Sequence, residues 1–210
     1  YEYVVSNLPW YIKWIATIVG YRGSEERAFE YLLRAAETGY FVKIDARVLL
    51  MILYVREKQH DYALEVAQQL HQRFPENFLF HLNQAQILER MERREEAAGV
   101  LTEIVRRAES GTKNYDKMPL GKIRYALGTR LVALGERESA LHQFQEAARD
   151  PRTAEKERAL SHLEAGQILD SMGEREEAVS HYEAVKGLDD VEDSHRVATE
   201  HLRTPYRPKR

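Results

Sequence analysis

Five alanines, each at the end of a short charged segment, mark a repeat along the chain. They are Ala28, Ala63, Ala97, Ala140 and Ala178, separated by 35, 34, 43 and 38 residues. Apolar residues recur nine positions before each alanine and four and seven positions after it. Offsets of three, four and seven residues place side chains on one stripe of an α-helix. The pattern therefore predicts an all-α chain made of five helix pairs.

Small residues dominate a second repeated position, twelve residues before each alanine. The residues there are Ala16, Met51, Ala85, Gly128 and Gly166. Small side chains allow two helices to approach closely, so we expect the first and second helix of each pair to meet at this position and at the alanine. In three of the five turns a glycine precedes the alanine by five residues, and glycine accepts the positive φ that commonly ends a helix.

Helix pairs with a period near 34 residues resemble the tetratricopeptide repeat family. A generic helical bundle is the alternative, but a bundle needs no fixed period. The resemblance implies a solenoid that is a right-handed α–α superhelix, with a single domain over residues 1–203. The expected repeats are 9–42, 44–77, 78–111, 121–154 and 159–190, followed by a capping helix at 194–203 and a basic disordered tail at 204–210. The polar segment 109–119 is expected to be an exposed loop.

A narrower resemblance covers about the first 100 residues. The segments 8–13, 19–28 and 74–80 are similar to the inclusion-body-clearance family of fungi, to its animal tetratricopeptide-39 relatives, and to bacterial look-alikes. The eukaryotic members are associated with the mitochondrial outer membrane or with lipid droplets. This chain lacks their additional N-terminal part, so their location is not carried over.

The first helix of each repeat lines the concave groove in tetratricopeptide proteins, and the resemblance places a binding groove there. The N-terminal half of this groove would be aromatic and aliphatic, and either open or covered by other parts of the chain. The C-terminal half would be polar, with Glu164 and Asp170 at its end. The residues expected to contact a partner are Trp14, Tyr21, Leu49, Ile52, Arg56, Asn83, Gln86, Arg90, Lys122, Tyr125, Thr129 and Gln167.

Some proteins of this type hold the C-terminal carboxylate of a chaperone with a clamp of Lys, Asn and Arg residues. Asn83 and Lys122 match two clamp positions, but Val48, Ile52 and Ala126 occupy others. Binding of chaperone tails is therefore not expected. Arg90 and Lys122 remain candidates to hold an acidic group.

No arrangement of residues in the sequence points to catalysis, a cofactor or a metal. Cysteine is absent, which excludes disulfides and thiolate sites. The chain has neither a phosphate-binding loop nor a His-Glu-x-x-His motif. The acidic segment 192–201 contains two histidines, but a solvated helix accounts for it better than a metal site. A net charge of −3 gives no indication of nucleic-acid binding.

These observations predict a protein-interaction scaffold that is not an enzyme and that binds a peptide or partner protein in the groove. One alternative is a membrane- or lipid-associated adaptor anchored by Trp10, Trp14 and their neighbours. Another is an architectural segment of a longer chain, since the sequence does not begin with Met. Self-association through an exposed end is also compatible with a solenoid. With no apolar stretch of about 20 residues, a soluble protein is expected, and cytoplasm and periplasm both stay open.

Overall fold

The computed structural model describes residues 25–38 and 43–208. Regular structure in this part of the chain is helical, with no strand, which confirms the all-α prediction. The chain divides into two compact units, Tyr1–Arg73 and Phe74–Arg210. Each unit is described by itself below.

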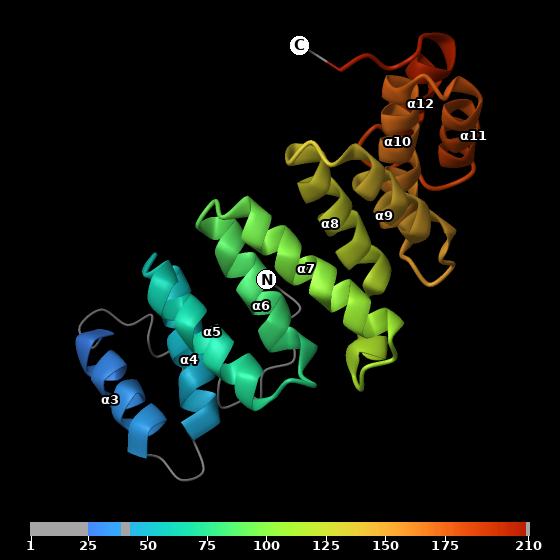
Figure 1. Ribbon diagram of the computed structural model, residues 1–210. Coiled ribbons are helices and arrows are strands. Elements are labelled where there is room, and N and C mark those ends of the chain that lie inside the picture. The colour runs from blue at the N-terminus through green and yellow to red at the C-terminus, as the bar shows by residue number, and fades with distance from the viewer. Residues whose placement is uncertain (1–24, 39–42, 209–210) are drawn as a thin grey trace. The chain divides into compact units, whose positions relative to one another are not determined.

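Three helices form the described part of the N-terminal unit (Figure 1): α3 (Glu25–Thr38), α4 (Lys43–Arg56) and α5 (His60–Arg73). Helix α4 packs against both of the others. A small core at the contact of α3 with α4 contains Ala36, Ala46 and Leu50. Phe29 and Tyr54 pack on it with their rings edge to face, 5.0 Å between centroids.

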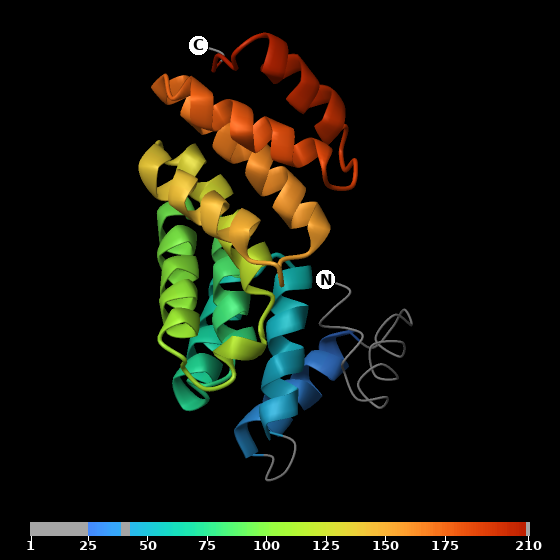
Figure 2. The same ribbon diagram turned by 90° about the vertical axis from the view of Figure 1, so that its right-hand side faces the viewer.

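The C-terminal unit is a series of antiparallel helix pairs. The helices are α6 (Phe78–Arg90), α7 (Arg94–Glu109), α8 (Leu120–Ala133), α9 (Arg137–Arg149), α10 (Glu155–Met172), α11 (Arg175–Lys186) and α12 (Ser194–Arg203). Each helix packs mainly on its neighbours in the chain, and both views show α8 and α9 between the α6–α7 and α10–α11 pairs (Figures 1 and 2). This is the nearest-neighbour packing expected of a solenoid.

The turn inside each described pair has the same backbone conformation. The residue five positions before the turn alanine has a positive φ: Lys58 at 59°, Glu92 at 58°, Gly135 at 82° and Gly173 at 88°. The next residue donates its N–H to a carbonyl five residues earlier, as in the bond from Arg93 to Leu88 at 3.0 Å. This pattern is a Schellman-type helix end. Two glycines take the conformation predicted for them, and Lys58 and Glu92 adopt it despite their side chains.

Close contact between the two helices of a pair depends on complementary side-chain volumes. A Cβ atom on Gly128 would lie 2.7–2.9 Å from the ring of Phe144, and one on Gly166 would lie 2.6–2.9 Å from the ring of Tyr182. Across the four described pairs, the first-helix residue becomes smaller as the buried second-helix residue becomes larger. The pairs of positions are Met51 with Ala67, Ala85 with Leu101, Gly128 with Phe144, and Gly166 with Tyr182.

The segment between α7 and α8 is not simply an exposed loop, contrary to the expectation from its polar sequence. It contains a short 3-10 helix, η1 (Tyr115–Lys117). Tyr115 is fully buried and Met118 nearly so, and both belong to the main core of the unit. The Tyr115 hydroxyl lies 3.1 Å from Nδ1 of His81 and donates to the carbonyl of Pro75 at 3.4 Å. One aromatic side chain thus fixes the segment against α6.

The C-terminal end of the unit is held by a buried carboxylate. Asp170 has a side chain that is 1% exposed, and it forms an ion pair with Arg175 at 2.9 Å. It also accepts hydrogen bonds from the Tyr182 hydroxyl at 3.0 Å and from the backbone N–H of Tyr206 at 2.7 Å. Arg175 in turn donates to the carbonyls of His201 and Leu202 at the end of α12.

The tail was expected to be disordered from residue 204. Residues 204–208 have no regular secondary structure in the part of the chain that is described. Tyr206 nevertheless lies against the unit, through its bond to Asp170 and an edge-to-face contact with His201 at 5.3 Å. The expectation of disorder is therefore wrong for this portion, because a hydrogen bond to a buried carboxylate fixes it.

The volume rule predicts the effect of one added methyl group. We expect Gly128→Ala to lower the free energy of unfolding by about 1–3 kcal/mol, since the new Cβ overlaps the Phe144 ring. The Gly128→Ala/Phe144→Leu double variant recreates the Ala85–Leu101 combination, and it should lose less than the sum of the two single variants. Chemical denaturation measures all three. Gly99→Ala is the control: nothing lies within 4 Å of its added Cβ, so helix propensity should raise stability by about 0.5–1 kcal/mol. Strict additivity of the double variant would contradict the rule.

The turn conformation predicts a stabilising glycine. Glu92 is exposed and has a φ of 58°. Replacing it with Gly removes the steric cost of a left-handed residue, and we expect a gain of about 0.5–1 kcal/mol. Glu95, exposed in the first turn of α7, serves as the comparison. Glu95→Gly should instead lose up to about 1 kcal/mol by helix propensity. Equal losses in the two variants, measured by thermal or urea unfolding, would show that the turn carries no such strain.

Candidate functional site

The first helices of the three pairs in the C-terminal unit present one row of accessible side chains. On α6 these are Asn83, Gln86 and Arg90; on α8, Lys122, Tyr125 and Thr129; on α10, Glu164 and Gln167. Within each helix they are separated by three, four or seven residues, so each set lies on one stripe. We call this surface the first-helix face.

Every predicted partner-binding residue of this unit retains some exposure. Gln86, Arg90, Lys122 and Thr129 are exposed, and Asn83, Tyr125 and Gln167 are half-buried. Gln86, Thr129 and Gln167 occupy the same position in successive repeats, eleven residues before the turn alanine. The face therefore repeats a polar side chain once per helix pair. Their role in binding stays a prediction.

Two contacts connect the three helices beneath the face. Arg130 of α8 forms a bidentate ion pair with Glu89 of α6, at 2.7 and 2.9 Å. Tyr125 of α8 packs on Phe144 of α9 with 5.8 Å between ring centroids. Burial raises the pKa of Tyr125, and the charges of Glu164 and Glu192 raise it further. The Tyr125 hydroxyl is therefore close enough to α10 to be influenced by the Glu164 carboxylate.

Glu164 is a half-buried carboxylate without a cation beside it. It forms no ion pair or side-chain hydrogen bond with any residue that the structure describes. Burial alone raises its pKa. The nearby acid Glu192 differs, because it is exposed and pairs with Lys156 at 2.7 Å. The sequence placed Glu164 in the groove, but gave no signal that Tyr125 would lie next to it.

Arg90 and Lys122 do not come together to hold one acidic group, as the sequence allowed. Lys122 is at the repeat position of Leu79, near the start of α6, whereas Arg90 is at the end of that helix. Eleven residues of helix separate these two levels, about 16 Å along the axis. The face therefore has a cation at each end rather than one cationic cluster.

Asp170 was expected to line the groove, and this expectation is wrong. Its side chain is 1% exposed and already binds Arg175, Tyr182 and Tyr206. A ligand on the first-helix face therefore meets Glu164 and Gln167 of α10, but not Asp170.

The other predicted residues belong to the N-terminal unit. Leu49 and Ile52 of α4 are half-buried, so part of each apolar side chain is accessible. Arg56 is exposed and pairs with the adjacent Glu57 at 2.8 Å. Trp14 and Tyr21 lie outside the described residues, as do Trp10 and the other residues of the expected membrane anchor.

The acidic and histidine-containing segment near α12 does not gather metal ligands. No group of three or more His, Asp or Glu side chains suited to a metal occurs in the described part of the chain. His195 hydrogen-bonds the Leu188 carbonyl at 2.8 Å, and His201 packs between Tyr182 and Tyr206. Arg196 pairs with Asp193 and Glu200.

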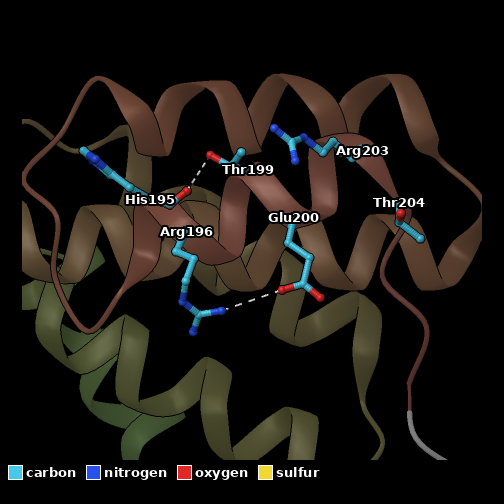
Figure 3. A pocket seen from close by; sticks show the side chains of 6 residues that line it. All are labelled: His195, Arg196, Thr199, Glu200, Arg203 and Thr204. Carbon is cyan, nitrogen blue, oxygen red and sulfur yellow. Dashed lines mark hydrogen bonds and ion pairs between the residues drawn. The ribbon is translucent and has the colours of Figure 1, made fainter.

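A surface depression on α12 has a volume of about 440 Å³. Figure 3 shows its lining residues, which all come from this helix and the residue that follows it: His195, Arg196, Thr199, Glu200, Arg203 and Thr204. Thr199 donates to the His195 carbonyl at 2.7 Å, and Arg196 reaches Glu200 at 3.8 Å. A depression lined by one helix encloses little of a ligand. This is the polar outer surface of a capping helix.

Two histidines form a buried pair that the sequence did not predict. Nδ1 of His162 on α10 lies 3.0 Å from Nδ1 of His181 on α11. One ring must donate and the other accept, so both are neutral in this geometry. Burial lowers the pKa of His162 to about 4, with His181 and Arg158 adding to the effect. Burial also lowers the pKa of His181, with a further contribution from Arg149.

Solved structures with the same architecture are tetratricopeptide proteins. MamA, residues 41 to the end, from Desulfovibrio magneticus RS-1 is 19% identical and superposes with a TM-score of 0.59 over 86% of this chain and 94% of that one. YrrB, described as a TPR protein with an unusual peptide-binding site, is 21% identical with a TM-score of 0.56, over 84% of this chain and 87% of that one. No protein-family model and no curated protein sequence matches the chain.

The class of fold is therefore established as an all-α helix-pair solenoid of the tetratricopeptide type. Identities near 20% show this fold and nothing about a shared partner. No helix in the described ranges is long and apolar enough to cross a bilayer.

The histidine pair predicts a pH-dependent loss of stability. Since the folded-state pKa values are lowered from 6.5, the unfolded chain binds more protons as the pH falls below about 6.5. We expect the free energy of unfolding to decrease by about 1–2 kcal/mol between pH 7 and pH 5 relative to a His162→Gln/His181→Gln variant. Urea titrations at each pH measure the difference.

Other acids do not obscure this comparison. The ion pairs of Glu103 with Arg106 and Arg107 lower its pKa to about 2, so its stabilising contribution is lost only below its unfolded value near 4.5. The raised pKa of Glu164 acts in the opposite direction, but it is common to both proteins and cancels. Parallel pH profiles would show that the pair is not held neutral.

Proposed function

We propose that the chain is a protein-interaction scaffold that binds a peptide or an extended segment of a partner on the first-helix face. The observation that carries the proposal is the unused hydrogen-bonding capacity of this face. Asn83, Gln86 and Gln167 form no side-chain hydrogen bond with a described residue and retain solvent exposure. A side-chain amide both donates and accepts, which suits a peptide backbone.

The spacing of these amides fits an extended ligand. Packed helices lie about 8–10 Å apart, so three successive first helices span about 20 Å. An extended chain covers this distance with about six residues. Lys122 and Arg90 at the two ends of the face add positive charge, Glu164 adds negative charge, and Tyr125 offers an aromatic surface. Such a mixture gives register as well as affinity.

The fold adds support of a general kind. YrrB, with the same architecture, is described as having a peptide-binding site. Solenoids of helix pairs create extended surfaces on which successive repeats contribute equivalent positions. Gln86, Thr129 and Gln167 are such a set.

The narrower likeness to the inclusion-body-clearance family belongs to the same proposal as a finer possibility of kinship. It depends mainly on segments 8–13 and 19–28, of which all but the last four residues lie outside the described part of the chain. The membrane-adaptor alternative depends on the same region. No described contact favours it over peptide binding.

A comparison of two triple variants tests the proposal. Asn83→Ala/Gln86→Ala/Gln167→Ala removes the three amides from the first-helix face. Glu103→Ala/Glu177→Ala/Glu183→Ala changes three residues of the second helices α7 and α11. Affinity capture from source-cell lysate, quantified by mass spectrometry, should show a partner that is retained by the second variant. The same partner should be reduced about tenfold or more by the first variant.

Folding must be checked for both variants by circular dichroism, since Glu103 forms ion pairs within α7. A partner that both variants retain equally would move binding away from this face. A partner lost only with the second-helix variant would place the interaction on α7 and α11 and reject the proposal.

A further inference from the structure

The first-helix face contains one group whose surroundings ask for a ligand of specific charge. Most charged side chains near it are satisfied within the protein: Arg130 by Glu89, and Glu192 by Lys156. Glu164 is the exception among the described acids of the face, because it is half-buried and has no ion-pair partner. Removing water from a carboxylate without supplying a cation is unfavourable.

The neighbourhood of Glu164 suits a long basic side chain. Tyr125, on the adjacent helix α8, is half-buried and near enough for the Glu164 charge to act on its hydroxyl. One side of the Tyr125 ring system packs toward Phe144 at 5.8 Å, and part of the residue remains accessible. An Arg or Lys stem can lie along such a ring while its cation meets the carboxylate. Gln167 lies one turn further along α10 and is accessible to the same ligand.

We infer that Glu164 and Tyr125 form a subsite for an arginine or lysine side chain of the bound peptide. The inference rests on the proposed function and narrows it, because it assigns the partner a basic residue at one fixed position. A partner segment made only of acidic or apolar residues does not fit, since it would leave the half-buried carboxylate unpaired. The free cations Lys122 and Arg90 lie elsewhere on the face and do not neutralise Glu164.

The subsite is tested with random peptides rather than a known partner. A phage-displayed library of random 12-residue peptides is selected on the immobilised full chain, in wild-type form and as Glu164→Gln. Glu183→Gln, an exposed acid on α11, is the matched control. Wild type and control should enrich peptides with Arg or Lys at one aligned position. The Glu164→Gln protein should lose this enrichment by about tenfold while still selecting peptides.

A double-mutant cycle then isolates the pair. One enriched peptide is synthesised with its arginine or with citrulline, which keeps the shape and removes the charge. We expect about tenfold weaker binding of the citrulline peptide to wild type, and no difference between the two peptides on Glu164→Gln. Calorimetry measures all four affinities.

The possible failures have different meanings. Enriched peptides without a common basic position, or equal binding of arginine and citrulline, would overturn the subsite and leave peptide binding intact. A basic preference that Glu164→Gln retains would also overturn it, because the cation would bind elsewhere. Absence of any enriched peptide on wild type would contradict the proposed function itself.

Discussion

Close approach of the two helices in each pair is the constraint on which the rest of the structure depends. The turn alanines Ala63, Ala97, Ala140 and Ala178 are completely buried, so the backbones come together where these side chains lie. At Gly128 and Gly166 the partner ring occupies the space that a Cβ would need. This contact sets how the first helix lies on the second, and therefore which side of the first helix stays accessible. The binding face proposed for α6, α8 and α10 is a consequence of this packing.

Polar groups of the C-terminal unit divide into those that the fold uses and those that it leaves free. Asp170, Arg175 and the Tyr206 backbone connect α10, α11 and α12. Arg124 is buried and binds Glu109 at 2.6 Å and Gln143 at 3.1 Å. These residues stabilise the unit and have no spare capacity for a ligand. Asn83, Gln86, Glu164 and Gln167 differ because the fold gives them no polar side-chain partner among the described residues, so any recognition must come from them.

The sequence predicted the fold because its signals are local and periodic. Turn alanines, small first-helix residues and glycines with positive φ recur at fixed offsets, and each offset corresponds to a helix geometry. The burial of Tyr115 was missed because a tyrosine inside a polar, glycine-containing segment gives no periodic signal. Asp170 was misplaced for a related reason: the repeat assigns positions to an inner or outer stripe, but the terminal repeat packs against α12 and the tail instead of another repeat. The pairs His162–His181 and Tyr125–Glu164 join different helices, and a single sequence does not show which side chains of neighbouring helices meet.

The inverse relation between the two facing positions has a consequence for how such a chain avoids misfolding. Chains of similar repeats risk pairing a helix with the wrong neighbour, since every helix has an apolar stripe of nearly the same design. Here a wrong pairing carries a volume penalty. Met51 set against a residue as large as Phe144 would be overpacked, and Gly166 set against Ala67 would leave a void. Each first helix is thus matched in size to its own second helix, and the four pairs act as distinguishable units within a repetitive sequence.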